Sequence, residues 1–164
     1  MIIVGFDPGL ATLGYGVIEK GKDYKAQMID YGVISTPKDE NLAVRLCMIE
    51  QGVKQIIEKF KPDEIAVEEL FFAKNVTTGI NVAHARGVLL LTVAKECGRL
   101  YEYTPLQIKQ ALTGYGRADK HQIQAMVKTY LNLKSIPRPD DAADALAVAL
   151  CHAQTNKLGK LFSI

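Results

Sequence analysis

The sequence has little cysteine, and the cysteines it has are not paired. Cys47, Cys97 and Cys151 show neither disulfide-framework nor zinc-ligand spacing, and they fall in segments with helical patterns. The histidines also occur singly, without the spacing of metal ligands. These absences exclude a disulfide-stabilised fold and a Cys/His zinc site, and they indicate reduced thiols in a cytoplasmic protein.

Long apolar runs, repeats and low-complexity segments are also missing. No run approaches the roughly 18 apolar residues of a membrane span, and the first residues have the pattern of a core strand instead of a signal peptide. We therefore expect no membrane segment. A net charge of +2 is too small to indicate nucleic-acid binding by itself, so any basic surface depends on local clustering of Lys and Arg.

Length and composition indicate a single domain over residues 1–164. A hydrophobic fraction of 48% and a charged fraction of 23% are ordinary for a globular α/β domain. Short connections favour antiparallel pairing of the first three strands, and a long helix before the fourth makes that strand parallel to the first. The patterns predict strands at residues 2–7, between Gly9 and Gly21, at about 26–35, at 65–67 and at 99–103, and helices at residues 42–60, 74–97, 106–112, 119–131 and from 139 onward.

The two long helices differ in pattern. Residues 42–60 place apolar side chains at spacings of 4, 3, 4, 3 and 4, which forms one apolar stripe along a helix. We expect this stripe to pack on the sheet, and part of it could serve a dimer interface. The sequence does not divide the stripe between these uses. In residues 74–97, the small residues Ala83, Ala85 and Gly87 suit a close approach to the sheet.

The first candidate for chemistry is Asp7. The strand before it is a nearly continuous apolar run, which predicts a strand buried on both faces in the middle of a sheet. Pro8 and Gly9 end this strand, so Asp7 lies at its carboxyl end, where ligand sites gather in open α/β sheets. The alternative is a turn carboxylate that accepts hydrogen bonds from its own backbone.

A second buried strand, at residues 65–67, is followed by Glu68 and Glu69. If this strand and the first are parallel neighbours, Asp7 and one of the glutamates emerge side by side. Two glutamates after a strand are otherwise explained as a solvated edge. The choice between Glu68 and Glu69 is open at this point.

The last helix begins with Pro139 and a group of aspartates. Pro in the first turn with acids close behind is typical of a helix start, so Asp140 and Asp141 are explained as residues that complement the helix dipole. Asp144 lies a turn further in, among alanines, and is not explained that way. Asp141 and Asp144 share a helix face, but so do Asp140 and Asp144, so spacing does not choose between them.

Three segments therefore bring acids to one edge of the predicted sheet. Two like charges 4 Å apart cost about 4 kcal/mol at an effective dielectric of 20, and a hard divalent cation is the usual reason for keeping such a cluster. Four acids match two ions, about 3.5–4 Å apart, on the two sides of a phosphoryl displacement. We expect two Mg²⁺ ions per active site, with Mn²⁺ able to substitute.

Several phrases of the sequence resemble one family. GFDPGLATLGYGVI, AVEELFFAKN, ARG at residues 85–87 and PDDAADALAVAL are similar, in this order and over nearly the whole chain, to the RuvC family of bacterial crossover (Holliday) junction endonucleases. The resemblance implies a ribonuclease H-like fold with a five-stranded mixed sheet flanked by helices. It implies metal-dependent cleavage of four-way junction DNA in recombination and repair, a homodimer, and partnership with RuvA and RuvB. It places the family's four catalytic acids on Asp7, Glu68, Asp141 and Asp144.

The resemblance also implies DNA contacts. The family counterpart of Phe71 stacks on an opened base, and Lys109 and Lys120 match basic residues near the active site. An exposed aromatic beside a catalytic acid is a stacking platform, whereas core packing explains a buried one, and which of Phe71 and Phe72 contacts DNA is open. A phosphate-binding face is expected to use Lys74, Arg86, Lys109, Arg117 and Lys120, although each is separately explained as a solvated charge.

Two other functions fit parts of the sequence. A nucleotide-binding phosphotransfer domain of the actin and sugar-kinase type also begins with a strand that ends in Asp and Gly. That class needs a second copy of the fold, for which 164 residues leave no room. A non-catalytic scaffold that binds junctions has no need of all four acids. Mg²⁺ titration of junction cleavage separates the three hypotheses.

Overall fold

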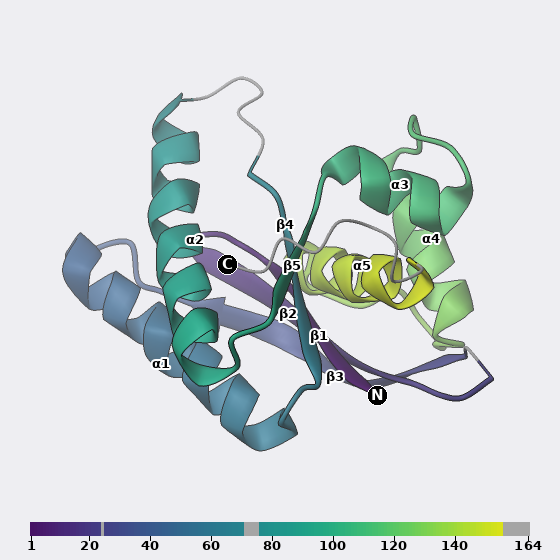
Figure 1. The fold of residues 1–164 in the computed structure, drawn as a ribbon. Coiled ribbons are helices and arrows are strands. Elements are labelled where there is room, and N and C mark those ends of the chain that lie inside the picture. Colours follow the sequence, from purple (N-terminus) through teal and green to yellow (C-terminus); the bar gives the residue numbers. More distant parts are fainter. Residues whose placement is uncertain (24, 71–75, 156–164) are drawn as a thin grey trace.

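The computed structural model describes residues 1–23, 25–70 and 76–155, which form a central sheet between two layers of helices (Figure 1). The sheet order is β3-β2-β1-β4-β5. β1, β2 and β3 are antiparallel neighbours, while β4 and β5 continue the sheet parallel to β1. The strands are β1 (Ile2–Asp7), β2 (Thr12–Lys20), β3 (Ala26–Ser35), β4 (Glu64–Glu68) and β5 (Leu100–Tyr103). The predicted five-stranded mixed sheet is therefore confirmed.

Helices cover both faces of the sheet, and each face has its own apolar core. One layer contains α1 (Leu42–Phe60) and α2 (Val76–Glu96), and the other contains α3 (Pro105–Thr113), α4 (Lys120–Tyr130) and α5 (Asp140–Gln154) (Figure 1). α1 begins where the Asn41 side chain accepts a hydrogen bond from the N–H of Val44. Its predicted stripe reaches the core through Ile49, Val53 and Ile56.

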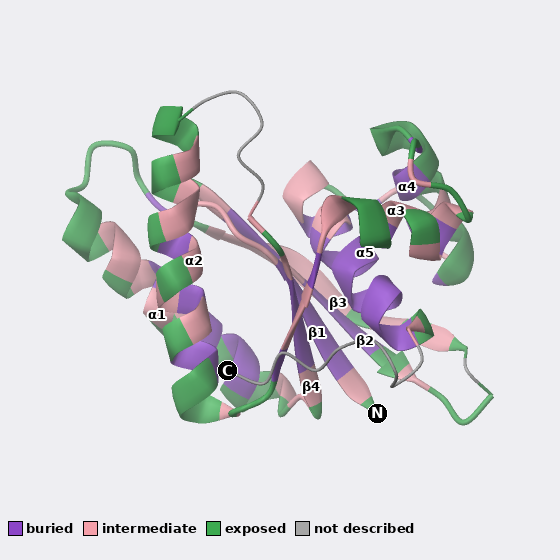
Figure 2. Ribbon diagram, turned by 45° about the horizontal axis from the view of Figure 1, so that its top comes forward, coloured by how far each residue is buried: buried purple, intermediate pink, exposed green. Residues whose placement is uncertain are grey.

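α5 lies directly against the backbone of β1 and β2, and Figure 2 shows it as the most completely buried helix. A Cβ atom at Gly5 would lie 2.2 Å from the carbonyl oxygen of Ala145, and one at Gly14 would lie 2.0 Å from that of Asp141. Only glycine permits this approach. The predicted close approach at Gly87 of α2 is wrong, because a Cβ atom there would meet nothing within 4 Å.

α2 is more apolar than the sequence patterns predicted. Among the described helices it is the one that is long and apolar enough to cross a membrane by length and composition alone. The search for an uninterrupted apolar run did not find this segment, because polar residues interrupt it while its valines, leucines and alanines keep the mean hydropathy high. In the fold, Ala85, Leu89 and Val93 of α2 pack into the core shared with α1 and the sheet. Arg86 of the same helix pairs with Glu102 of β5.

Candidate active site

Three of the predicted acids meet at one edge of the sheet. Asp7 ends β1, and the first two turns of α5 bring Asp141 and Asp144 to the same place. One carboxylate oxygen from each of the three residues lies within 4.8 Å of the other two. This is a spacing at which a shared cation can be held.

The fourth acid, Glu68, ends β4 beside Asp7. The register pairs Phe6 of β1 with Val67 of β4, so the next residue of each strand reaches the edge together. The charge of Glu68 raises the pKa of Asp7, as expected for carboxyl groups at the ends of neighbouring strands. Glu69 is exposed, and its backbone N–H donates to the carbonyl oxygen of Tyr103 over 2.8 Å. The geometry therefore groups Glu68, and not Glu69, with the other acids.

Asp140 occupies a different position from Asp141. Its carboxylate faces the Arg138 guanidinium, accepts a hydrogen bond from the Gln124 amide over 3.1 Å, and lies 3.3 Å from the Lys120 ammonium. These charges and the hydrogen bonds from Lys120 and Gln124 lower the pKa of Asp140. Of the two residues that spacing left open, Asp141 belongs to the cluster and Asp140 is a neighbour that holds basic side chains.

Burial and mutual repulsion disfavour the charged forms of the clustered acids. Burial is the largest cause that raises the pKa of Asp7, to about 9, and the charges of Glu68, Asp144 and Asp141 add to it. Burial also comes first in raising the pKa of Glu68 and of Asp144. These shifts favour a protonated Asp7 at neutral pH when no cation neutralises the cluster.

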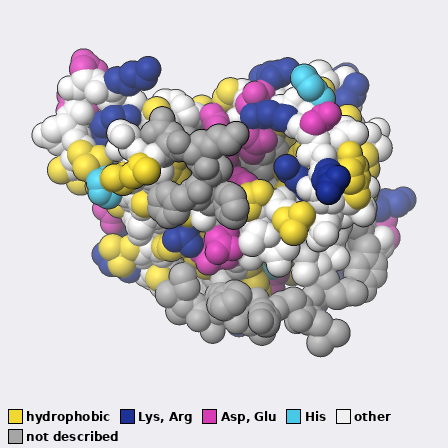
Figure 3. Space-filling view, turned by 90° about the horizontal axis from the view of Figure 1, so that it is seen from above, with side chains coloured by type: hydrophobic (Ala, Val, Ile, Leu, Met, Phe, Trp, Pro, Cys, Tyr) yellow, Lys and Arg dark blue, Asp and Glu magenta, His cyan; other side chains and the backbone are white. Residues whose placement is uncertain are grey.

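Basic residues stand on one side of this cluster. The Lys120 ammonium, from the first turn of α4, lies 3.4 Å from the carboxylate of Asp144 and bridges it to Asp140. A cavity of about 240 Å³ opens beside the acids, with Glu68, Asp144, Lys109 and Lys120 in its wall. Figure 3 looks onto this edge of the molecule and shows acidic side chains in a hollow with basic side chains next to them.

The remaining predicted DNA-binding residues are placed unevenly. Arg86 forms an ion pair with Glu102, so its charge is already compensated within the protein, and its buried Nε has no hydrogen-bond partner among the described residues. Arg117 is exposed in the loop between α3 and α4. Phe71, Phe72 and Lys74 lie outside the described residues. The assignment of all these side chains to DNA stays a prediction.

Comparison with known proteins connects this site to a family. A family model described as crossover junction endodeoxyribonuclease RuvC matches residues 3–152. A protein of that name from Clostridioides difficile is 54% identical over 98% of this chain and 94% of its own length. Another, from Petrotoga mobilis, is 57% identical over 93% of both chains.

Solved structures agree with the sequence comparison. The structure described as T. thermophilus RuvC in complex with Holliday junction substrate matches with a TM-score of 0.88 and 38% identity, over 94% of this chain and 93% of the other. The yeast mitochondrial Holliday junction resolvase matches with a TM-score of 0.69 at 15% identity, over 93% of this chain and 78% of the other, and shares the fold alone. The ribonuclease H-like fold is thereby confirmed. With the family model and relatives above half identity, the chain belongs to the RuvC family of crossover junction endodeoxyribonucleases.

Proposed function

We propose that Asp7, Glu68, Asp141 and Asp144 are the acids with which this nuclease hydrolyses phosphodiester bonds in four-way DNA junctions. The observation that carries the proposal is the convergence of Asp7, Asp141 and Asp144, whose carboxylate oxygens lie within 4.8 Å of one another. Glu68, at the end of the neighbouring strand, completes the group, and its charge raises the pKa of Asp7. Carboxylates that repel one another in a partly buried cluster are explained if the cluster binds cations, which neutralise their charge.

The donor set fits a hard divalent cation. All four groups offer carboxylate oxygen, the ligand that Mg²⁺ and Mn²⁺ prefer, and no His or Cys takes part in the described cluster. We propose about two Mg²⁺ ions per site, with Mn²⁺ as a substitute. When bound, such ions lower the pKa of water and stabilise charge on the attacking and leaving oxygens of a phosphodiester.

The chain's own side chains then have separate tasks. Asp7, whose pKa is raised, must be deprotonated before the cluster holds a cation, because the ligands are carboxylates. Lys109 and Lys120, in the wall of the cavity beside the acids, are positioned to attract a phosphate of the incoming strand. Phe71 remains our candidate for stacking on an opened base, and Lys74, Arg86 and Arg117 remain candidates for more distant phosphates.

Junction DNA has two-fold symmetry, and we propose that a homodimer of this chain matches it. A relative solved in complex with Holliday junction substrate supports the choice of DNA. Exposed apolar side chains on α1 and α2, among them Leu42, Val44, Ile80 and Leu91, offer a surface for the second copy. We further propose that the dimer acts in the cytoplasm with RuvA and RuvB.

Adjacent glutamates provide a matched test of this proposal. We expect Glu68→Gln to reduce cleavage of a synthetic junction by about a hundredfold or more, since it removes a charge that would hold the cation. Glu69→Gln is expected to stay within about twofold of the unmodified chain, because successive strand residues point to opposite faces. The measurement is single-turnover cleavage over a range of Mg²⁺ concentrations. If both substitutions reduce cleavage equally in folded proteins, the assignment of Glu68 as the metal-binding glutamate is wrong.

Asp140 gives a second prediction. Lys120 lies between Asp140 and Asp144, so in Asp140→Asn it faces Asp144 alone and competes more strongly with a cation there. We expect the half-saturating Mg²⁺ concentration for cleavage to rise about threefold, in keeping with the modest strength of exposed ion pairs. Asp23→Asn, which removes the partner of Lys25 elsewhere on the surface, is the control. An Asp140 variant that behaves like the control would mean that Asp140 does not restrain Lys120.

A further inference from the structure

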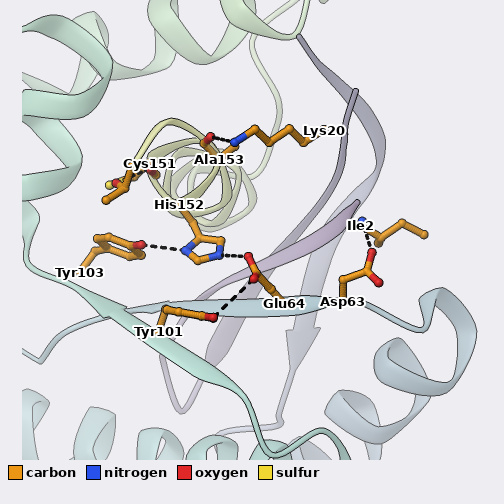
Figure 4. Close-up of polar contacts among 10 residues, drawn as sticks. Ile2, Lys20, Asp63, Glu64, Tyr101, Tyr103, Cys151, His152 and Ala153 are labelled. Carbon is orange, nitrogen blue, oxygen red and sulfur yellow. Dashed lines mark hydrogen bonds and ion pairs between the residues drawn. The ribbon is translucent and has the colours of Figure 1, made fainter. Parts of the chain in front are cut away.

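A buried polar cluster lies at the end of α5 farthest from the acids. The side chain of His152, in the last turn of α5, is 7% exposed. Its Nδ1 is 2.7 Å from the hydroxyl of Tyr103 on β5, and its Nε2 is 2.6 Å from the carboxylate of Glu64 at the start of β4. Figure 4 shows His152 between these two partners, with Tyr101 hydrogen-bonded to the other oxygen of Glu64 over 3.4 Å.

The contacts are fully satisfied by one neutral form of His152. The Tyr103 hydroxyl donates to Nδ1, and Nε2–H donates to the Glu64 carboxylate. Burial lowers the pKa of His152, which is consistent with the neutral ring. The Tyr101 ring also packs against the imidazole, with ring centroids 4.4 Å apart. The imidazole is therefore fixed in position, orientation and tautomer by two different strands.

This cluster joins two of the three elements that carry the acids, α5 and β4. α5 has Asp141 and Asp144 in its first turns and His152 in its last, while β4 has Glu64 at its start and Glu68 at its end. A rise of about 1.5 Å per residue puts roughly 12 Å of helix between Asp144 and His152. Any sliding or tilting of α5 along β4 changes the separation of Asp144 from Glu68.

Between its two ends, α5 packs on the sheet mainly through apolar side chains. The buried face of α5 is mostly alanine, and it rests on Gly5, Gly14 and Gly16 of the sheet. At the acid end, carboxylate oxygens of Asp141 and Asp144 on α5 and of Asp7 on β1 lie within 4.8 Å of one another, and like charges at this separation repel. At the far end, His152 binds two strands, and the Lys20 ammonium donates to the carbonyl oxygen of Ala153 over 2.5 Å. Attraction at one end thus opposes repulsion at the other.

From this arrangement we infer that His152, with Glu64 and Tyr103, is a positioning residue of the metal site. It fixes α5 along β4 and β5 and so sets the distance between the acids of α5 and Glu68. The inference rests on the proposed metal-binding function of the acids. A purely structural role would lower the melting temperature of variants and leave their affinity for the cation unchanged.

The experiment compares Tyr103→Phe, His152→Gln and His152→Leu with Val53→Ala. Val53 is buried on the opposite face of the sheet, in the core with α1, so its truncation controls for lost stability. Tyr103→Phe removes a single hydroxyl, and His152→Gln keeps an amide that can still donate to Glu64. Each protein is melted over a series of Mn²⁺ concentrations, which gives the half-saturating Mn²⁺ for stabilisation without any cleavage. Junction binding is measured in EDTA.

We expect half-saturating Mn²⁺ to rise about threefold in Tyr103→Phe and about tenfold in His152→Leu, with His152→Gln between them, as for partners that orient metal ligands. Val53→Ala should match the unmodified chain, and junction binding in EDTA should stay within about twofold in all variants. If Mn²⁺ fails to stabilise the unmodified chain, the proposed metal site itself is wrong. Tyr103→Phe disturbs the fold least and is therefore the decisive variant. If Mn²⁺ stabilises the unmodified chain and the half-saturating Mn²⁺ concentration of Tyr103→Phe is unchanged, His152 has a structural role alone and the inference is overturned. Loss of junction binding together with the Mn²⁺ response would also overturn it.

Discussion

Asp7→Asn is expected to reduce junction cleavage by about a thousandfold or more, equivalent to roughly 4 kcal/mol of transition-state stabilisation. Asp7 is the acid most surrounded by the others, because Glu68, Asp141 and Asp144 all act on its pKa. Asn has nearly the same shape but no charge, so the cluster would lose a ligand at its centre. Junction binding in EDTA is expected to change by less than about threefold, since affinity for DNA comes mainly from phosphate contacts.

Asp63→Asn is the matched control for this substitution. Asp63 lies at the opposite end of β1, where its carboxylate accepts a hydrogen bond from the N–H of Ile2 over 2.7 Å. The control tests whether loss of any aspartate beside this strand impairs cleavage, and it is expected to remain active. A folded Asp7→Asn protein that has lost junction binding along with cleavage would argue against a metal-binding role and for a role in DNA binding.

Much of this fold was predictable because its elements have strong local patterns. The apolar stripe through Ile49, Val53 and Ile56 predicts α1, and the structure buries these residues as one face of that helix. The apolar run of residues 2–7 predicts a central strand, and β1 lies between β2 and β4. From the order of elements alone, β4 had to run parallel to β1, which already brought Asp7 and a glutamate to one edge.

The choice among neighbouring acids was not predictable from spacing. Asp140 and Asp141 both share a helix face with Asp144, and only the packing of α5 on β1 turns Asp141 toward Asp7. The resemblance to the family chose Asp141 and Glu68, and these two residues lie beside Asp7 in the structure, while their catalytic role stays a prediction. For Arg86 the resemblance and the structure point to different uses. The matching motif predicts a DNA contact, but in the structure Arg86 pairs with Glu102 of β5, a contact that no local sequence pattern predicts.

The His152 cluster was out of reach of sequence patterns for the same reason. His152 and Glu64 are separated by 88 positions, and Tyr103 comes from a third element. Each of these residues is unremarkable in its own segment. Their contact depends on how far α5 slides along the sheet, which is set by tertiary packing against glycine and alanine.

The second large effect concerns the stability of the protein without metal. The folded-state pKa of Asp7, about 9, lies well above its ordinary value of 3.8, so the folded state binds more protons than the unfolded state between these two pH values. Stability without metal therefore falls as pH rises through this window, by up to about 1.4 kcal/mol per pH unit for one group. The raised pKa values of Glu68 and Asp144 act in the same direction.

In EDTA, Asp7→Asn is therefore expected to melt at a higher temperature than the unmodified chain at pH 8, with the difference fading near pH 4. Mn²⁺ should raise the melting temperature of the unmodified chain at pH 8. At a hundredfold excess over its dissociation constant, it should add about 2.7 kcal/mol to the free energy of unfolding. At pH 5 the gain should be smaller, because protons compete for the same carboxylates. Asp140→Asn is the control and should have the opposite effect. The pKa of Asp140 is lowered in the folded state, so its carboxylate stabilises the fold at pH values above the pKa of the unfolded state. Its loss should therefore lower the melting temperature at pH 8. If Asp7→Asn instead melts lower in EDTA at pH 8, and Mn²⁺ leaves the unmodified chain unchanged, the acids are structural caps and the metal-dependent mechanism is wrong.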